Sequence, residues 1–263
     1  MPPAVMRRIG LLALAIGVTS IGLASAQHPE IDRRRAADRK SFSDREIALG
    51  FFKVAFGAEL GLAGRVDRIR KYEQPVRVFI SGPASPPART AVERVVGDIR
   101  RHVAHLDIAM TRDSAAANFL VRLVPDRDLE ATVRRLYGAN GRRIVRSLEP
   151  QCLSGIRKDA HYRIVSSDVI LVSDAAPPVF YDCAYEELLQ ALGPIRDDPT
   201  VPWTMFNDNV QKGFFDVYDQ YILNILYHPR VRAGMTRTQV RRLLPQIMPD
   251  VRAHVAKTNG FAP

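Results

Sequence analysis

Apolar side chains recur along this chain with two different spacings, and the order of these spacings constrains its fold. Three short segments are rich in valine, isoleucine and phenylalanine, which predicts strands, and two longer segments have apolar residues at helical spacing. The predicted strands are residues 75–80, 118–124 and 162–172, and the predicted helices are residues 87–106 and 126–137. An earlier helix is predicted to begin at Ser43, which forms the pattern of a capping box with Glu46. Strands that alternate with helices are typical of an α/β or α+β fold, in which a mixed sheet packs on helices.

The last part of the chain is predicted to be helical. One helix is predicted at residues 214–227, and another begins at Thr236, which forms the pattern of a capping box with Gln239. Proline lacks a backbone N–H and clashes with the preceding helical turn, so Pro245 is expected to break or kink this last helix. The expected architecture therefore has a helical C-terminal part.

The first 26 residues have the composition of a secretory signal peptide. Two arginines precede an apolar run at residues 9–23, and small residues follow at positions 24–26. Cleavage before Gln27 is expected, so the protein is expected to be exported, to a periplasm or out of the cell. No later segment is apolar for long enough to cross a bilayer, so no membrane span is expected after cleavage.

The remaining residues suit one large domain. Residues 27–41 are rich in charge and are expected to form a flexible lead-in. Residues 42–245 are expected to form a single α/β domain, and residues 246–263 a C-terminal tail.

The chain is basic, with 38 lysines and arginines against 28 acidic residues and a formal charge of +10. Loss of Arg7 and Arg8 with the signal peptide would leave +8. Long-range attraction then favours a negatively charged partner, such as an anionic envelope component or an acidic protein. Nucleic acid is not expected as a partner, because the chain carries an export signal and lacks the usual nucleic-acid-binding patterns.

Two cysteines, Cys152 and Cys183, are present, and an even count in an exported chain predicts one disulfide. The alternative, a catalytic thiol, would need a nearby base and a lowered pKa.

Residues 183–193, Cys-Ala-Tyr-Glu-Glu-Leu-Leu-Gln-Ala-Leu-Gly, have the spacing of a zinc-peptidase helix. In such a helix, histidines one turn apart bind the metal and the glutamate between them activates a water molecule. Here Glu186 and Gln190 occupy histidine positions, and Glu187 occupies the position of the catalytic glutamate. A neutral amide is a poor zinc ligand, and Arg196 at the third histidine position would repel a cation. No metal and no cofactor are therefore expected.

The acidic residues around this helix have two further interpretations. A hard cation such as Ca²⁺ could bind Glu186, Glu187, Asp197 and Asp198 through carboxylate oxygens. Surface salt bridges with nearby arginines are the favoured interpretation, because exposed ion pairs are common and nearly neutral in energy.

The polar residues of this helix fall on one side at 100° per residue, which predicts a binding face. The residues expected on or beside that face are Glu186, Gln190, Asn207 and Asp208, and the catalytic candidate is Glu187. Two histidines, His102 and His105, are spaced for a shared metal ion, but no cysteine or acid cluster accompanies them. They are interpreted as residues at the edge of the core.

Several stretches of the chain combine into one pattern, at Lys71 to Val78, Cys152, Cys183 to Gly193, Asp197, Met205 to Asp208, Asp219, and Ile222 to Thr236. Over roughly residues 42–245, this pattern resembles an exported bacterial family, the domain of unknown function family 2927. A fainter resemblance to the metzincin peptidases rests on the helix and on Met205, which lies about where those enzymes form their methionine turn. Together the resemblances imply a zincin-like fold without the zinc ligands, and they bring no established activity.

The predicted function is a non-catalytic, zincin-like binding or envelope-associated domain. The alternative is an exported hydrolase with an atypical active site around Glu187. A third interpretation is a structural envelope protein in which the helix only contributes to the core.

Overall fold

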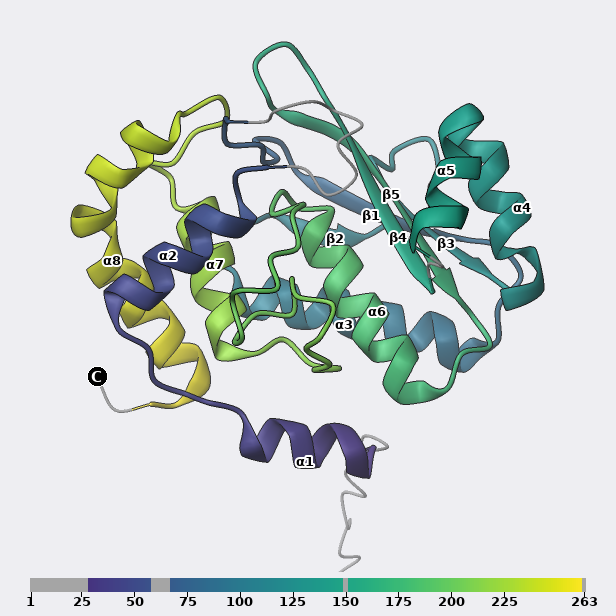
Figure 1. Ribbon diagram of the computed structural model, residues 1–263, viewed down its shortest axis with the longest axis horizontal. Coiled ribbons are helices and arrows are strands. Elements are labelled where there is room, and N and C mark those ends of the chain that lie inside the picture. The colour runs from purple at the N-terminus through teal and green to yellow at the C-terminus, as the bar shows by residue number, and fades with distance from the viewer. Residues whose placement is uncertain (1–27, 58–66, 149–150, 262–263) are drawn as a thin grey trace, which may run out of the picture.

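The computed structural model describes residues 28–57, 67–148 and 151–261, and its centre is a five-stranded sheet (Figure 1). The strands are β1 (Val76–Ser81), β2 (Ile108–Met110), β3 (Phe119–Val124), β4 (Cys152–Lys158) and β5 (Ile164–Val172). Their order is β2-β1-β3-β5-β4, in which β4 is antiparallel to β5 and the other pairs are parallel. The expected mixed sheet is therefore present.

Helices cover both faces of the sheet because the side chains of its central strands alternate between two apolar clusters. In β5, Val169 and Leu171 belong to the main core, whereas Ile170 and Val172 belong to a smaller second core. The main core packs against α3 (Pro86–His102) and α6 (Pro177–Gln190). The second core packs against α4 (Asp126–Tyr137) and α5 (Ala139–Leu148), which lie together at one end of the sheet (Figure 1).

The predicted helical C-terminal part is confirmed. It consists of α7 (Val217–Tyr227), which is buried along its whole length, and α8 (Arg237–Asn259), and both pack against α2 (Asp44–Val54). Pro245 was expected to break or kink the last helix, and α8 is not broken there but continues to Asn259. Its buried residues, among them Leu244 and Ile247, hold the helix against α7, and such packing outweighs the loss of a hydrogen bond at proline.

Four elements are not predicted from the sequence. Three of them, β2, β4 and α5, lie between predicted elements, and α1 (Pro29–Ala37) lies in the segment expected to be a lead-in. The expected signal peptide, residues 1–26, lies outside the described residues. None of the helices described in the structure is long and apolar enough to cross a membrane.

The predicted disulfide between Cys152 and Cys183 is present and joins β4 to α6. The two Cα atoms are 5.8 Å apart, and the cysteines are separated by 31 positions in sequence. The bond therefore fixes the edge strand of the sheet to the helix that carries Glu186.

Replacing both cysteines by serine is expected to lower the free energy of unfolding by about 3 to 4 kcal/mol, because the unfolded chain loses a closed loop. Urea unfolding of the oxidised protein and of the Cys152→Ser/Cys183→Ser variant measures the difference. Reduction should destabilise the parent protein by a similar amount and leave the variant unchanged. Equal stability of variant and parent would contradict a structural role for the bond.

Candidate functional site

Helix α6 begins at two prolines, Pro177 and Pro178, and the chain turns sharply just beyond its last residue, Gln190. Gly193 adopts φ +140°, and a Cβ atom at this position would overlap the carbonyl oxygen of Arg70. The glycine thus allows two backbones to touch, and the chain turns back along α6 after it. This turn brings the residues after Gly193 next to Glu186.

Three carboxylates meet beside α6, and we call Glu186, Asp197 and Asp208 the acidic cluster. Each can offer one oxygen so that the three atoms lie within 4.8 Å of one another. Glu186 and Asp197 are half-buried, and Asp208 is exposed. Carboxylate oxygens in this arrangement could hold a hard divalent cation or an organic cation.

Gln190, at a histidine position of the peptidase pattern, is 2% exposed and holds Asp197 in place. Its Nε2 donates to Oδ1 of Asp197 at 2.7 Å, and its Oε1 accepts from Ser154 Oγ on β4 at 3.3 Å. Both ends of the amide are therefore used to connect β4, α6 and the acidic cluster.

Glu187, the catalytic candidate, is 7% exposed, so the polar side of α6 does not face bulk water at this residue. The helix contacts β4 and β5 and is buried along most of its length, including Glu187 and Gln190. Glu187 acts on its neighbour through its charge, since it is one of the groups that raise the pKa of Glu186.

Burial raises the pKa of Glu186 to about 10, and repulsion from Glu187 and Asp197 adds to this effect, followed by Asp182 and Asp208. Without a bound cation, the Glu186 carboxyl is therefore protonated at neutral pH. A positive charge at the cluster would reverse this effect and favour the carboxylate.

Of the predicted binding-face residues, the structure brings Glu186, Gln190 and Asp208 together but not Asn207. The Asn207 amide donates to the carbonyl oxygens of Pro199 and Val201 and accepts from the Asn209 N–H, which shapes the loop. Asn207 therefore supports the loop on which Asp208 lies.

Asp198 has the salt-bridge role that was expected for the acids of this region. Its carboxylate lies 3.8 Å from Lys53 Nζ and 3.6 Å from an Arg196 nitrogen. The carboxylate also accepts a hydrogen bond from the Thr200 N–H. Arg196 and Asp198 thus form their own ion pair beside the acidic cluster.

Asp219 supports the loop that contains Met205 and Asp208. This carboxylate is fully buried on α7, accepts from the Met205 N–H at 2.7 Å, and accepts from the Thr204 hydroxyl at 2.5 Å. Burial raises its pKa, and the neighbouring Asp216 raises it further. The role of Asp219 was not predicted, although the residue was part of the family resemblance.

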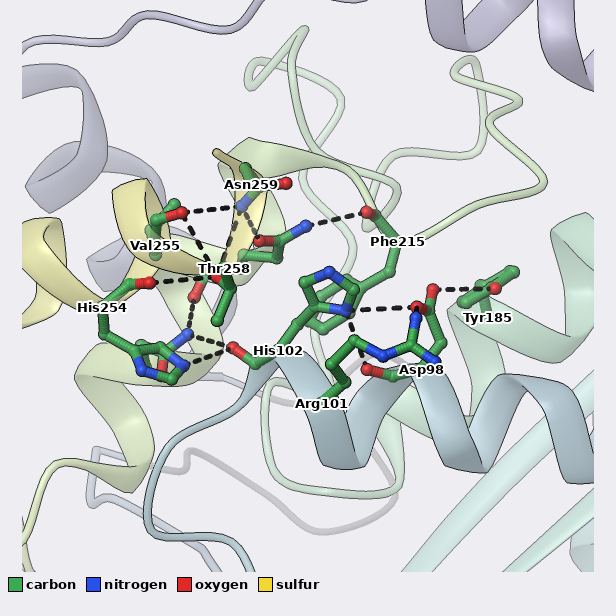
Figure 2. A network of polar contacts seen from close by, with 11 residues as sticks. Asp98, Arg101, His102, Tyr185, Phe215, His254, Val255, Thr258 and Asn259 are labelled. Atoms are coloured by element: carbon green, nitrogen blue, oxygen red, sulfur yellow. Dashed lines mark hydrogen bonds and ion pairs between the residues drawn. The ribbon is translucent and has the colours of Figure 1, made fainter. Parts of the chain in front are cut away.

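The other side of α6 is anchored to α3 through a polar network (Figure 2). The Tyr185 hydroxyl donates to Asp98 at 3.0 Å, and Asp98 lies 3.1 Å from Nδ1 of His102. Burial favours the neutral imidazole, but the hydrogen bonds and charge of Asp98 outweigh this effect and raise the pKa of His102. His102 thus anchors the helices at the edge of the core.

A family model described as "Protein of unknown function (DUF2927)" matches residues 44–246 of the chain. No curated protein and no solved structure gives a significant match.

Glu186→Gln is expected to stabilise the protein at neutral and mildly alkaline pH. Because the folded-state pKa is raised to about 10, stability of the parent protein falls as pH rises from the usual glutamate range toward that value. The variant should equal the parent near about pH 4.5 and gain on the order of 1 kcal/mol of relative stability for each pH unit up to about pH 8.

Urea unfolding at both pH values measures this effect. The matched control is Glu130→Gln on the exposed face of α4, which should show no comparable dependence on pH. A larger stabilisation in acid than in base would contradict the raised pKa of Glu186.

Asp98→Asn is expected to destabilise the protein more at about pH 6 than at about pH 8.5. The raised pKa of His102 stabilises the fold below the unfolded histidine pKa, and this contribution is lost as pH rises through the folded value. Thermal unfolding of parent and variant at the two pH values tests this. An equal destabilisation at both would show that the ion pair contributes nothing.

Proposed function

The chain belongs to the family of proteins of unknown function DUF2927, which brings no activity with it, and we propose that it is a non-catalytic, zincin-like binding domain. In this proposal the acidic cluster is the recognition site, and it receives a positively charged group.

The observation that carries this proposal is the close approach of three acidic side chains in a basic chain. In the described residues, no basic side chain forms an ion pair with Glu186 or Asp208, while the nearby Lys53 and Arg196 pair with Asp198 instead. Three acidic side chains with oxygens within 4.8 Å of one another oppose each other's ionisation, and a bound cation would allow all three to be ionised. The site therefore has the chemistry to bind a cation.

The residues at the zinc-ligand positions support binding rather than peptidase chemistry. The Gln190 side-chain amide is already hydrogen-bonded to Ser154 and Asp197, and a neutral amide is a weak ligand for zinc. Arg196 would place a fixed positive charge at the third ligand position. In this proposal the fold descends from a zincin ancestor, from which the central helix is retained and the zinc ligands are lost.

Export is part of the same proposal. The signal-like residues at the start of the sequence and the disulfide between Cys152 and Cys183 both suit an oxidising compartment. An envelope-associated role follows from the overall positive charge, which would hold the domain near anionic polymers or acidic proteins.

A hydrolase is the second candidate, because a carboxyl with a pKa of about 10 can donate a proton at neutral pH. In that case Glu187 would act as the base and Glu186 as the acid. A Glu187→Gln variant that folds normally and loses a measured hydrolytic activity would favour this candidate over the binding domain.

Isothermal titration of the protein with calcium chloride, at constant ionic strength, tests the cation site. We expect one Ca²⁺ to bind, and Glu186→Gln and Asp208→Asn each to weaken binding by about tenfold or more, because each removes a charged ligand. The matched control, Glu130→Gln on α4, should bind as the parent does.

A second titration, with methylguanidinium chloride, separates a metal ion from an organic cation, and binding of either one at the cluster supports the proposal. Binding of neither ion overturns it. Stoichiometric zinc that is lost in Gln190→Ala would also overturn it, in favour of a peptidase-type metal site.

A further inference from the structure

A pocket of about 300 Å³ lies apart from the acidic cluster, and two of the sequence stretches that carry the family resemblance form its walls. Residues 71–75, just before β1, form one wall, and residues 227–232, at the end of α7 and just beyond it, form another. The turn between α3 and β2, at residues 105–107, closes a third side. No residue of the acidic cluster lines this pocket.

Lys71 is the buried cation that lines the pocket. It is 5% exposed, its Nζ donates to the Val231 carbonyl oxygen at 2.8 Å, and it lies 5.0 Å from the centre of the Tyr227 ring. Within the described part of the chain, Lys71 forms no ion pair with a carboxylate. Burial lowers its pKa to about 8, so the amine is still mostly protonated at neutral pH.

The two acids that line the pocket are already paired with other groups. Glu73 accepts from the Ala233 N–H at 3.0 Å and lies 3.4 Å from Nε of Arg232. Asp107 forms two hydrogen bonds with Arg77, at 2.9 and 3.1 Å. Glu73 also acts on Lys71 through its charge, but Lys71 has no direct ion pair in the described residues and is the buried cation that a ligand would meet.

The surface around Lys71 is partly polar and partly apolar. Leu106, Pro229 and Val231 line the pocket, together with the rings of Tyr72 and Tyr227. Both hydroxyls are engaged elsewhere, that of Tyr72 with Asn118 and Ser167, and that of Tyr227 with the Leu192 carbonyl oxygen. A ligand would therefore meet one buried cation and several apolar surfaces, an arrangement typical of small-molecule sites.

The backbone of the third wall is held in a costly conformation. His105 has φ 61°, a left-handed value that is unfavourable for a residue with a side chain. Such conformations concentrate at ligand sites, where the surrounding structure maintains them. Here the turn places Leu106 and Asp107 along the pocket.

We propose that this pocket binds a small monocarboxylic acid with an apolar body. Lys71 Nζ would donate to the carboxylate, and Leu106, Pro229 and the tyrosine rings would contact the apolar part. A single ammonium group matches one carboxylate charge, and Arg232, which would be needed to bind a doubly charged phosphate, is paired with Glu73.

Saturation-transfer NMR and calorimetric titration of the full chain with sodium benzoate test this proposal, with benzamide as the neutral analogue of the same shape. We expect benzoate to bind and benzamide to bind at least about tenfold more weakly, because the charge-assisted hydrogen bond is lost. Equal binding of the two compounds overturns the proposal, as does binding of sodium phosphate in the absence of benzoate binding.

Two variants assign the binding to this pocket. Lys71→Met keeps the apolar stem of the side chain and removes its charge. Leu106→Phe narrows the pocket without changing any charge. Each variant should weaken benzoate binding by about tenfold or more. The matched control is Lys158→Met, an exposed lysine that also stacks on a tyrosine ring, at 4.3 Å from the centre of Tyr162. If Leu106→Phe, or a folded Lys71→Met, binds benzoate as the parent does, the site lies elsewhere.

Discussion

The close approach of Gly193 to the backbone of Arg70 is the contact on which both the acidic cluster and the Lys71 pocket depend. On one side it ends α6 and turns the chain, so that Asp197 returns beside Glu186 and Gln190. On the other side it fixes the segment that continues into Lys71 and then into β1. The Tyr227 hydroxyl adds a second link across this junction through the Leu192 carbonyl oxygen. A side chain at position 193 would therefore disturb both regions at once.

The central elements of the fold could be predicted because their sequence signals are local. Helix α4 is predicted with its observed limits, since Pro125 precedes it and Gly138 follows it. The two strands that were not predicted are stabilised by pairing with neighbouring strands more than by their own sequence. Strand β2 has only three residues, and β4 is an edge strand that pairs with β5. Length and periodicity cannot identify such segments.

The candidate site was predictable residue by residue but not in its arrangement. The helical pattern indicated Glu186 and Gln190, because their spacing matches a known ligand pattern. Asn207 and Asp208 are adjacent in sequence, yet Asn207 bonds to the loop backbone while Asp208 belongs to the cluster. Such differences depend on the path of the loop between Gly193 and α7, which carries no periodic signal.

The charge of the whole chain and the charge of the site have opposite signs. The basic composition predicted an anionic partner, whereas the acidic cluster is suited to a cation. The two properties act over different distances, since the net charge influences approach and the cluster acts at contact. A partner that carries both signs of charge would be attracted by the basic chain and could place a cationic group at the acidic cluster.

The disulfide has a consequence for the order in which the molecule is assembled. Cys152 and Cys183 lie in elements close together in the chain, so the bond requires nothing beyond residue 183. Asp197, Asp208 and α7 all follow it in sequence. When the chain becomes available for folding from its N-terminus onward, the disulfide can join the edge strand to α6 before Asp197 and Asp208 are in place. The cluster is then completed against a helix that is already covalently fixed, which narrows the search for its final geometry.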